Sequence, residues 1–340
     1  MRPASPPNPS LIFETLNAYQ HTAVLRAAIE LDLFTAIGEG ASDIERAAAR
    51  CGASLRGIRI LCDCLVTLGF LEKENGDYRL KEESALFLDR RSPSYLGSVT
   101  AFLGSPDATE PFHRLARIVR VDGSRETGAT LAPDHPAWAL FARSMAPMMA
   151  APARMLAKLA AGMPPAPARI LDIACGHGLF GIEAAKMFPG SMVVAVDWSH
   201  VLEVARENAT RAGLDGRFHT ISGSALEADL EGGYDLVIIA NFLQLLGPAA
   251  CESLLRRVHA AMNPGGRVLT FGFIPDEDRV GPPSQALFAA TMLAMTPEGD
   301  AYPFSACDAM FSRAGFARSE LALLPSGQRV MVSHRSGPLE

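Results

Sequence analysis

The sequence predicts an α/β protein in which a Rossmann-like, seven-stranded sheet follows an N-terminal, mainly α-helical winged-helix domain. From residue 168 onward, near-continuous apolar segments alternate with segments of helical periodicity, as in a parallel sheet covered on both faces. Two apolar segments at the end of the chain predict a closing hairpin. Nearer the N-terminus, three helical segments precede an Asn75-Gly76 turn between strand-like residues. A length of 340 residues is consistent with two domains.

Composition restricts the class of protein. The chain is 49% hydrophobic and carries a net charge of −6, which disfavours a nucleic-acid-binding surface. No stretch approaches the roughly 18 consecutive apolar residues of a membrane span, and the first nine residues lack the apolar centre of a signal peptide. The 6 cysteines form no C-x-x-C pair and the 8 histidines have no zinc-ligand spacing. We therefore expect a cytoplasmic protein with reduced thiols and no metal site.

The N-terminal elements, taken in order, build the winged helix. One or two helices are expected over 11–37. Ser42, three residues before Glu45, has the spacing of a capping box and predicts the start of a short helix. Ser54 is expected to cap the third helix, and the Asn75-Gly76 turn then forms the wing.

The charges of this domain favour a protein interface over DNA. The candidate recognition helix has Arg56 and Arg59 but also Asp63, and the wing is rich in acidic residues. Such a surface cannot neutralise a run of phosphates. We therefore predict that the N-terminal domain mediates a homodimer.

A helical region links the two domains. Met145 and Met149 belong to an apolar stripe at helical spacing just before the sheet begins. The stripe is consistent with packing in a core, and also with a roof over an apolar substrate.

The second domain alternates strands and helices. The expected strands cover 168–174, 192–197, 218–221, 234–240, 267–273, 318–324 and 328–334. The expected helices cover 179–188, 201–212, 249–262 and 305–314.

The first strand leads into a glycine loop. Gly176 and Gly178 begin a G-x-G-x-x-G pattern, which alone is a weak signal for a dinucleotide. Asp172, four residues earlier, distinguishes the ligands, because a carboxylate beneath the loop would repel a pyrophosphate and attract the ammonium and sulfonium of S-adenosylmethionine (SAM). The pattern Asp-x-x-x-Gly-x-Gly resembles the first motif of class I SAM-dependent methyltransferases, so SAM is the predicted cofactor.

The following strands end in further candidate contacts, since ligands bind at the carboxyl ends of parallel strands. Asp197 can accept both ribose hydroxyls, although it could instead cap the next helix. Trp198 could stack on the adenine or pack in the core. The third strand ends at a predicted adenine-edge segment, and the fourth at residues expected to face the methyl group. These remaining candidates are Gly223, Ser224, Ala225, Asn241 and Phe242.

The two-domain layout resembles the small-molecule O-methyltransferases of the caffeate and hydroxyindole type and their bacterial relatives in secondary metabolism. The resemblance rests on the 171–178 loop, Val196-Asp197, Gly223-Ser224, the 263–269 turn and strand, and the 310–316 segment. It implies an N-terminal dimerisation domain, a SAM-binding catalytic domain, and methyl transfer to a small, largely apolar, aromatic or polyketide-like metabolite. We expect no nucleic-acid or membrane partner.

The sequence departs from this family where the base is expected. Relatives carry Asn-x-Leu-His after the fourth strand, with that His as general base, whereas this chain has Gln244. A glutamine amide cannot take a proton near neutral pH. Gln244 could orient an acceptor that needs no strong base. Alternatively, another residue takes the proton, with Asp300, Tyr302, His113 and His135 as candidates.

A third hypothesis is that methyl transfer has been lost or replaced by hydroxylation, decarboxylation or rearrangement.

The apolar excursion over 276–303 carries Met292 and Met295, which could line a flat hydrophobic substrate or form dimer core. The predicted domains are a disordered lead-in over 1–10, a winged helix over 11–95, a helical linker that contributes to the substrate pocket over 96–165, and the catalytic domain over 166–340.

Overall fold

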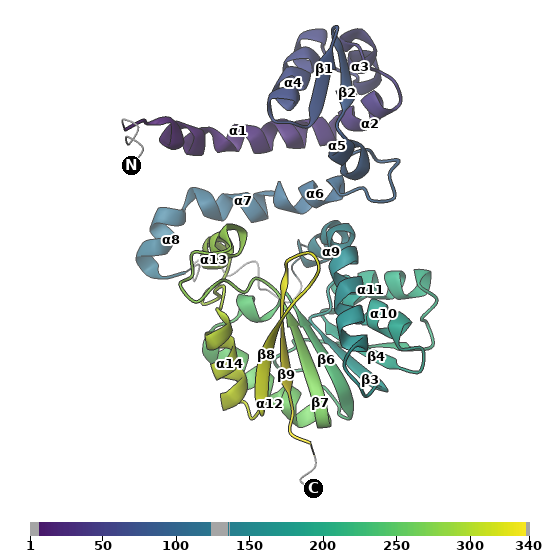
Figure 1. Cartoon of the computed structure of the whole chain (residues 1–340), viewed down its shortest axis with the longest axis vertical. Coiled ribbons are helices and arrows are strands. Elements are labelled where there is room, and N and C mark those ends of the chain that lie inside the picture. The colour runs from purple at the N-terminus through teal and green to yellow at the C-terminus, as the bar shows by residue number, and fades with distance from the viewer. Residues whose placement is uncertain (1–6, 124–134, 136, 338–340) are drawn as a thin grey trace, which may run out of the picture. The chain divides into compact units, whose positions relative to one another are not determined.

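The computed structural model describes residues 7–123, 135 and 137–337. The chain divides into two compact units, Met1–Gly104 and Ser105–Glu340. Each unit is described by itself (Figure 1). The predicted linker over 96–165 falls in both units.

Unit 1 is a small helical domain with a two-stranded wing. Its core is closed by large buried side chains, among them Phe34, Ile58, Leu65 and Tyr78. The antiparallel wing places Asn75 and Gly76 at positive φ, as the hairpin prediction requires. Its described elements are α1 (Ser10–Glu30), α2 (Leu33–Gly38), α3 (Ile44–Cys51), α4 (Leu55–Thr67), β1 (Leu71–Glu74), β2 (Asp77–Leu80), α5 (Glu82–Phe87), the 3₁₀ turn η1 (Gly97–Val99) and α6 (Thr100–Leu103).

One of the two predicted helix caps is correct and the other is displaced by one residue. The Ser54 side chain accepts a hydrogen bond from the Gly57 N–H and so caps α4, as predicted. The predicted cap at Ser42 is wrong. Asp43, one residue later, is the N-cap of α3, and its side chain accepts from the Arg46 N–H. Ser42 instead donates to Asp77 on the wing.

Unit 2 contains a seven-stranded sheet with the order β5-β4-β3-β6-β7-β9-β8. Five strands are parallel and the β8–β9 hairpin is antiparallel, as the sequence predicts. The strands are β3 (Arg169–Ile173), β4 (Met192–Asp197), β5 (Phe218–Ser222), β6 (Tyr234–Ala240), β7 (Met262–Phe271), β8 (Arg318–Leu323) and β9 (Arg329–His334). The helices are α7 (Pro106–His113), α8 (Leu115–Val121), α9 (Ala137–Ala161), α10 (Leu179–Met187), α11 (Ser199–Arg211), α12 (Pro248–Ala261), α13 (Pro283–Met295) and α14 (Phe304–Arg313), with a 3₁₀ turn η3 (Leu243–Leu245).

Helices cover both faces of the sheet because its central strands are apolar on both sides. One core lies between the sheet and α9, α10 and α11, and the other between the sheet and α12 and α14 (Figure 1). This confirms the predicted fold class. The cores bury the strands, so polar chemistry is confined to the loops at the strand ends.

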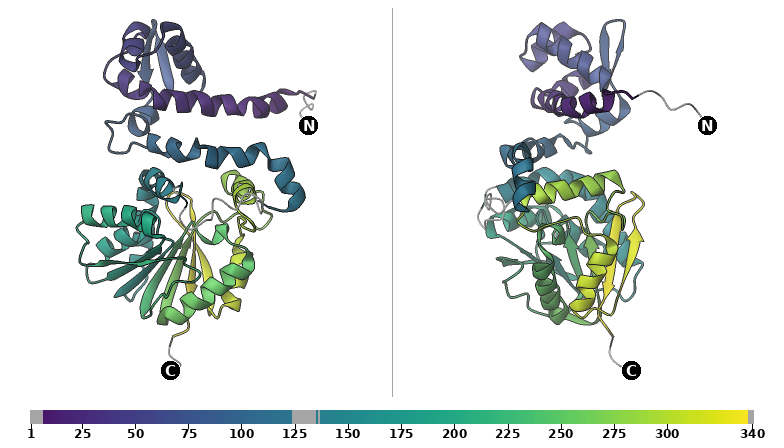
Figure 2. Two further views of the ribbon diagram at one scale, coloured as in Figure 1. Left: turned by 180° about the vertical axis from the view of Figure 1, so that it is seen from behind. Right: turned by 90° about the vertical axis from the view of Figure 1, so that its left-hand side faces the viewer.

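Several bounds in unit 2 differ from the prediction, and β7 begins at Met262, five residues earlier than predicted. The 276–303 excursion contains the helix α13, which lies over the carboxyl edge of the sheet (Figure 2). In addition, β7 ends at Phe271, two residues earlier than predicted, because Phe271 is the last residue paired with β6 and β9. Gly272 and Phe273 therefore leave the sheet and enter the loop that leads toward α13.

Candidate functional site

The glycine loop joins β3 to the start of α10. Gly176 and Gly178 have φ of 55° and 73°, conformations that favour glycine. A Cβ at Gly176 would meet nothing within 4 Å, so the loop is open to a ligand there. A Cβ at Gly178 would instead lie 3.0 Å from the Cβ of Ala205, so this glycine serves packing against α11. Of the two glycines predicted to make room for a ligand, Gly176 is the one with open space at its Cβ position.

Asp172 is buried beneath this loop. Its Oδ2 accepts a hydrogen bond of 2.9 Å from the Gly181 N–H, and its Oδ1 is buried without a hydrogen-bond partner. The pKa of Asp172 is raised to about 8, chiefly by burial and to a smaller extent by the nearby Asp197 carboxylate, while the hydrogen bond from the Gly181 N–H opposes the rise. An unpaired buried carboxylate oxygen favours a cationic or hydrogen-bond-donating ligand.

Asp197 connects the ends of two strands. Its Oδ2 accepts from the Gly176 N–H at 2.8 Å and its Oδ1 from the Trp198 N–H at 2.8 Å. The alternative that Asp197 caps the next helix is wrong, because Trp198 is the N-cap residue of α11 and no side chain caps that helix. Burial raises the pKa of Asp197, and the two N–H donors oppose that effect. Each oxygen retains lone pairs for a further donor.

The remaining residues predicted to bind the cofactor have local roles in the described structure. Trp198 packs on a small apolar cluster with Ala142, Val201 and Val204. The Gly223 N–H donates to the Asp197 carbonyl. Ser224 and Ala225 follow in the same turn. The Ser224 hydroxyl accepts from the Leu226 N–H, and the Ala225 methyl is buried in the core.

The predicted acceptor side lies at the ends of β6 and β7. Asn241 has a positive φ of 54° and donates from Nδ2 to the Met149 sulfur at 3.7 Å. Gln244 lies on η3 and is buried. A Cβ built on Gly272 would come within 2.6 Å of the Gln244 Oε1 and 3.9 Å of the Asn241 Oδ1. The missing side chain at Gly272 therefore makes room for the Gln244 amide.

The Gln244 amide differs from the other polar groups of the site. In the described part of the chain it has no hydrogen-bond partner. The turn that carries it is nevertheless held firmly. The Tyr302 hydroxyl donates to the Leu246 carbonyl at 2.7 Å, and the Cys251 thiol donates to the Leu243 carbonyl at 3.3 Å. Gln244 thus has a fixed backbone and a free amide.

The structure places the alternative bases in other interactions. Asp300 forms an ion pair of 2.7 Å with Arg279 and accepts from the Ala301 N–H. Burial raises the pKa of Tyr302, whose hydroxyl is a donor in the turn. His113 is exposed on α7, 3.3 Å from a glutamate one turn away. The His135 carbonyl contacts His200.

The predicted substrate-contacting side chains come from three elements. Met145 and Met149 are buried on α9, and Phe242 packs partly against the core next to η3. Met292 is buried on α13, and Met295 is half-buried at the end of that helix. Met149 contacts Asn241, so at least this part of the predicted roof meets the predicted site.

The sequence did not point to Gly272, to the stacking of Phe273 on Phe288 or to the unpaired amide oxygen of Gln285. Gly272 is a glycine directly after an apolar strand, which is a signal for close approach of another group. No comparable sequence signal identifies Phe273 or Gln285.

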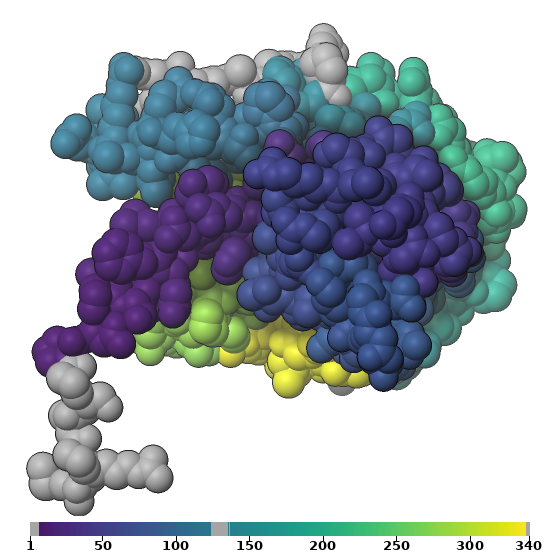
Figure 3. Space-filling view, turned by 90° about the horizontal axis from the view of Figure 1, so that it is seen from above, coloured from purple at the N-terminus to yellow at the C-terminus, as the bar shows by residue number. Residues whose placement is uncertain are grey.

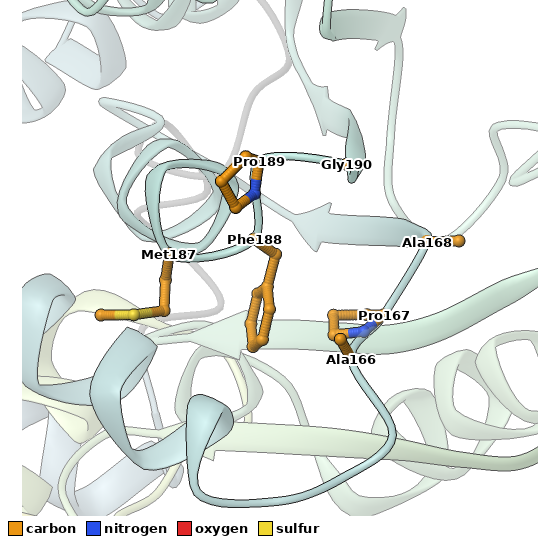
Figure 4. A pocket seen from close by; sticks show the side chains of 7 residues that line it. All are labelled: Ala166, Pro167, Ala168, Met187, Phe188, Pro189 and Gly190. Carbon is orange, nitrogen blue, oxygen red and sulfur yellow. The ribbon is translucent and has the colours of Figure 1, made fainter.

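A separate hollow of about 430 Å³ lies at the opposite, amino end of β3 and β4 (Figure 4). It is lined by Ala166, Pro167, Ala168, Met187, Phe188, Pro189 and Gly190. Its lining offers only apolar side chains and backbone, and it is remote from the glycine loop. Among the described residues, no group of three or more His, Cys, Asp or Glu could hold a metal ion, and no helix is long and apolar enough to span a membrane.

The sheet order and the loop geometry define a class I methyltransferase fold with an N-terminal helical domain. The O-methyltransferase domain family matches residues 134–317, and the O-methyltransferase dimerisation domain family matches residues 13–90. The chain therefore belongs to the O-methyltransferases, a family whose methyl donor is SAM. This confirms the predicted family, enzyme class and cofactor.

Similar proteins extend over nearly the whole chain. A Nostoc punctiforme structure assigned to the O-methyltransferases is 46% identical, with a TM-score of 0.93, and the match covers 97% of this chain and 100% of that one. The 3-hydroxy-5-methyl-1-naphthoate 3-O-methyltransferase of Streptomyces sahachiroi is 29% identical over 85% of this chain and 84% of its own length. Human N-acetylserotonin methyltransferase, solved with SAM, shares the fold with a TM-score of 0.84 at 22% identity, over 99% and 100% of the chains.

Proposed function

We propose that this O-methyltransferase acts on a small, flat, largely apolar aromatic or polyketide-like hydroxyl compound whose hydroxyl ionises readily. The single observation that carries this proposal is the free amide of Gln244 at the position of the predicted general base. The Streptomyces relative, named for a hydroxynaphthoate, supports the acceptor class.

The described residues fit SAM. We assign Asp172 to the cationic methionine end, because its Oδ1 is buried and unpaired. Asp197 accepts the ribose hydroxyls, since both oxygens are held at the end of β4 by backbone N–H groups. Gly176 lets the loop backbone approach the ligand. Gly178, Trp198, Gly223, Ser224 and Ala225 shape this half of the site through the backbone and through packing.

The acceptor half of the site orients the acceptor hydroxyl and does not take its proton. SAM supplies an electrophilic methyl group, and in the transfer an O–CH₃ bond forms as the S–CH₃ bond breaks. The Gln244 Nε2 donates to the acceptor oxygen and places it in line with the methyl group, which is positioning catalysis. Asn241, Phe242 and the methionines at 145, 149, 292 and 295 enclose the acceptor and exclude water.

The proton must therefore leave before the transfer. An amide cannot hold it, and Asp300, the other predicted catalytic residue, is paired with Arg279. The acceptor consequently binds as its phenolate or enolate and leaves its proton with solvent. This argument favours hydroxyls acidified by a fused ring or by a neighbouring carbonyl.

The likeness to a dimerisation domain supports a homodimer as the working form. In α1, apolar side chains lie in solvent over the first three turns, and in Figure 3 this helix extends away from the rest of unit 1. The exposed fractions are 74% for Leu11, 62% for Ile12, 60% for Phe13, 67% for Leu16 and 68% for Tyr19. Exposed apolar surface of this extent on one helix favours a second copy as its cover, which light scattering of the purified chain tests.

The main experiment combines calorimetric titration of SAM and S-adenosylhomocysteine (SAH) with transfer of a labelled methyl group to a panel of hydroxynaphthalenes and hydroxynaphthoates. We expect both nucleosides to bind and the most acidic hydroxyls to react fastest. Binding of SAH without transfer to any acidic hydroxyl would contradict the proposed reaction and favour a homologue that has lost methyl transfer or performs another reaction. Absence of binding would contradict the cofactor assignment of these residues.

A further inference from the structure

We propose that Phe273, Phe288 and Gln285 form a second contact site for the acceptor, which takes a planar aromatic ring carrying a hydrogen-bond donor away from the methylated oxygen. The inference rests on the proposed function and specifies the substrate class of the same site. It comes from the stacking of Phe273 on Phe288 and from the unpaired amide oxygen of Gln285, two contacts that no sequence pattern indicates.

The Phe273–Phe288 pair has an unusual geometry for this chain. Its ring centroids are 3.7 Å apart and its planes differ by 5°, so the rings overlap face to face. Phenylalanine pairs in the cores are tilted or edge-on, such as Phe180–Phe271 at 43° and Phe311–Phe316 at 66°. Offset and edge-on arrangements are favoured over a full sandwich because ring faces repel each other. A parallel pair of this kind presents a flat surface for a further ring.

One ring of the pair belongs to the residue that adjoins the proposed reaction site in the chain. Phe273 directly follows Gly272, whose missing Cβ makes room for the Gln244 amide. Both rings are half-buried, and neither belongs to the buried residues of the hydrophobic cores. The stack with Phe273 also determines which face of α13 is turned toward the end of β7.

Gln285 lies on this same face of α13. It precedes Phe288 by three residues and Met292 by seven, the spacing of one helical face. Gln285 is only 9% exposed, and its Oε1 is buried without a hydrogen-bond partner. By contrast, Leu287 on the opposite face is 72% exposed.

A buried amide oxygen without a partner is costly unless a ligand supplies the missing donor. The site therefore selects a ligand that is flat where it meets Phe273 and Phe288, and that carries a hydroxyl or amine where it meets Gln285. Together with the acceptor oxygen at Gln244, this describes a fused aromatic compound with two polar substituents.

The test measures binding of three probes to the SAH-saturated protein by calorimetry. The probes are 2-naphthol, 2,7-dihydroxynaphthalene and the saturated analogue decahydro-2-naphthol. We expect the wild-type chain to favour 2-naphthol over the saturated alcohol and the diol over 2-naphthol. The variant Phe288→Leu should weaken 2-naphthol binding about fivefold, since it removes the stacking contribution, and leave binding of the saturated alcohol unchanged.

The variant Gln285→Met keeps the size of the side chain and removes the acceptor oxygen. It should abolish the advantage of the diol, about tenfold for one hydrogen bond to a buried group, and leave 2-naphthol binding unchanged. The matched control is Leu287→Ala, which lies on the exposed face of the same helix and should bind all three probes as the wild type does. SAH affinity and melting temperature should match the wild type in all variants.

Three results would overturn the inference. They are equal affinity of the wild type for 2-naphthol and its saturated analogue, equal weakening of both by Phe288→Leu, and an advantage of the diol that survives Gln285→Met. Absence of naphthol binding to the SAH-saturated wild type would also contradict it. Failure of the proposed function would look different, because the wild type would then fail to bind SAH or to transfer a methyl group to any acidic hydroxyl.

Discussion

The two halves of the site are built in different ways. At the ends of β3 and β4, the carboxylates of Asp172 and Asp197 are held by backbone N–H groups of the loops around them. At the ends of β6 and β7, the backbone around Gln244 is held by hydrogen bonds, but its side-chain amide has no hydrogen-bond partner among the described residues. The side-chain oxygen of Gln285 is also unpaired. The first half is thus preorganised for one fixed ligand. In the second half, the acceptor supplies the missing hydrogen-bond partners, so these unpaired groups determine which substrate binds.

The largest effect is expected when the Asp197 carboxylate is removed from the cofactor half of the site. The Asp197→Ala variant should lower SAM affinity at least about 100-fold, because hydrogen bonds to a charged, buried acceptor each contribute strongly. Calorimetry measures this change. Asp215→Ala, an exposed carboxylate in the same unit, is the matched control and should leave affinity unchanged.

Asp197 also holds the Gly176 and Trp198 amides, so the variant should be checked for its melting temperature. Asp197→Asn, which keeps one acceptor oxygen, should show an intermediate loss of SAM affinity. Undiminished affinity in a folded Asp197→Ala protein would contradict the assignment of this carboxylate to the ribose.

A second effect concerns the acceptor half alone. In the Gly272→Ala variant, the added methyl group would lie 2.6 Å from the Gln244 Oε1 and displace the amide. We expect methyl transfer to fall about tenfold or more, since small misplacements of an orienting group are costly, while SAH affinity stays constant. The melting temperature should change little, because the displaced group is the end of a flexible side chain.

Gly216→Ala is the control for this variant, because a Cβ at Gly216 would meet nothing within 4 Å. If Gly272→Ala transferred methyl groups at the wild-type rate, the position of the Gln244 amide would not matter for the reaction.

The smallest effect is a pH dependence of cofactor binding. Burial raises the pKa of Asp172 from 3.8 to about 8, so the free folded protein holds a proton there at neutral pH. A cationic ligand favours the ionised form, so SAM affinity should rise severalfold between pH 6 and pH 8 with release of a proton. Calorimetry in buffers of different ionisation enthalpy measures that proton. In the Asp172→Asn variant, SAM affinity should depend on pH only through the ionisation of SAM itself.

The same shift gives an opposite trend for the ligand-free protein. Because the folded state holds the proton more tightly than the unfolded state, the Asp172 contribution makes the free energy of unfolding decrease as pH rises from 3.8 toward about 8. Saturating SAM should reduce this decrease. A SAM affinity with the same pH dependence in the wild type and in Asp172→Asn would contradict the proposed contact.

The contrast between the halves also explains what could be predicted from the sequence. The cofactor loop is local, since Asp172, Gly176 and Gly178 lie within seven residues and their spacing carries the signal. The fold could be predicted from strand–helix alternation because that pattern is also local in the sequence. The residues of the acceptor half come from η3, the end of β7 and α13, and no spacing in the chain announces that Gly272 meets Gln244.

Predictions for single residues were wrong where two neighbouring side chains, or two roles of one side chain, were chemically similar. The Ser42 cap was displaced to Asp43 because both side chains can accept from a helix N-terminus, and the wing offered Ser42 a partner. Asp197 does not cap α11, because Trp198 is the N-cap residue and the Asp197 carboxylate accepts from the Gly176 and Trp198 N–H groups. Such choices depend on contacts between distant segments, which local patterns do not contain.

The central claim is that Gln244 orients an acceptor that is already ionised, in place of a general base. The most direct measurement is the pH–rate profile of methyl transfer to 2-naphthol by the wild type and by Gln244→His, both saturated with SAM. We predict that the wild-type rate follows the ionisation of the acceptor itself, and that Gln244→His gains activity near neutral pH, up to about 100-fold, through an imidazole base. A wild-type profile with a protein pKa near neutrality that is independent of the acceptor would contradict the claim, because it would reveal a base elsewhere in the site.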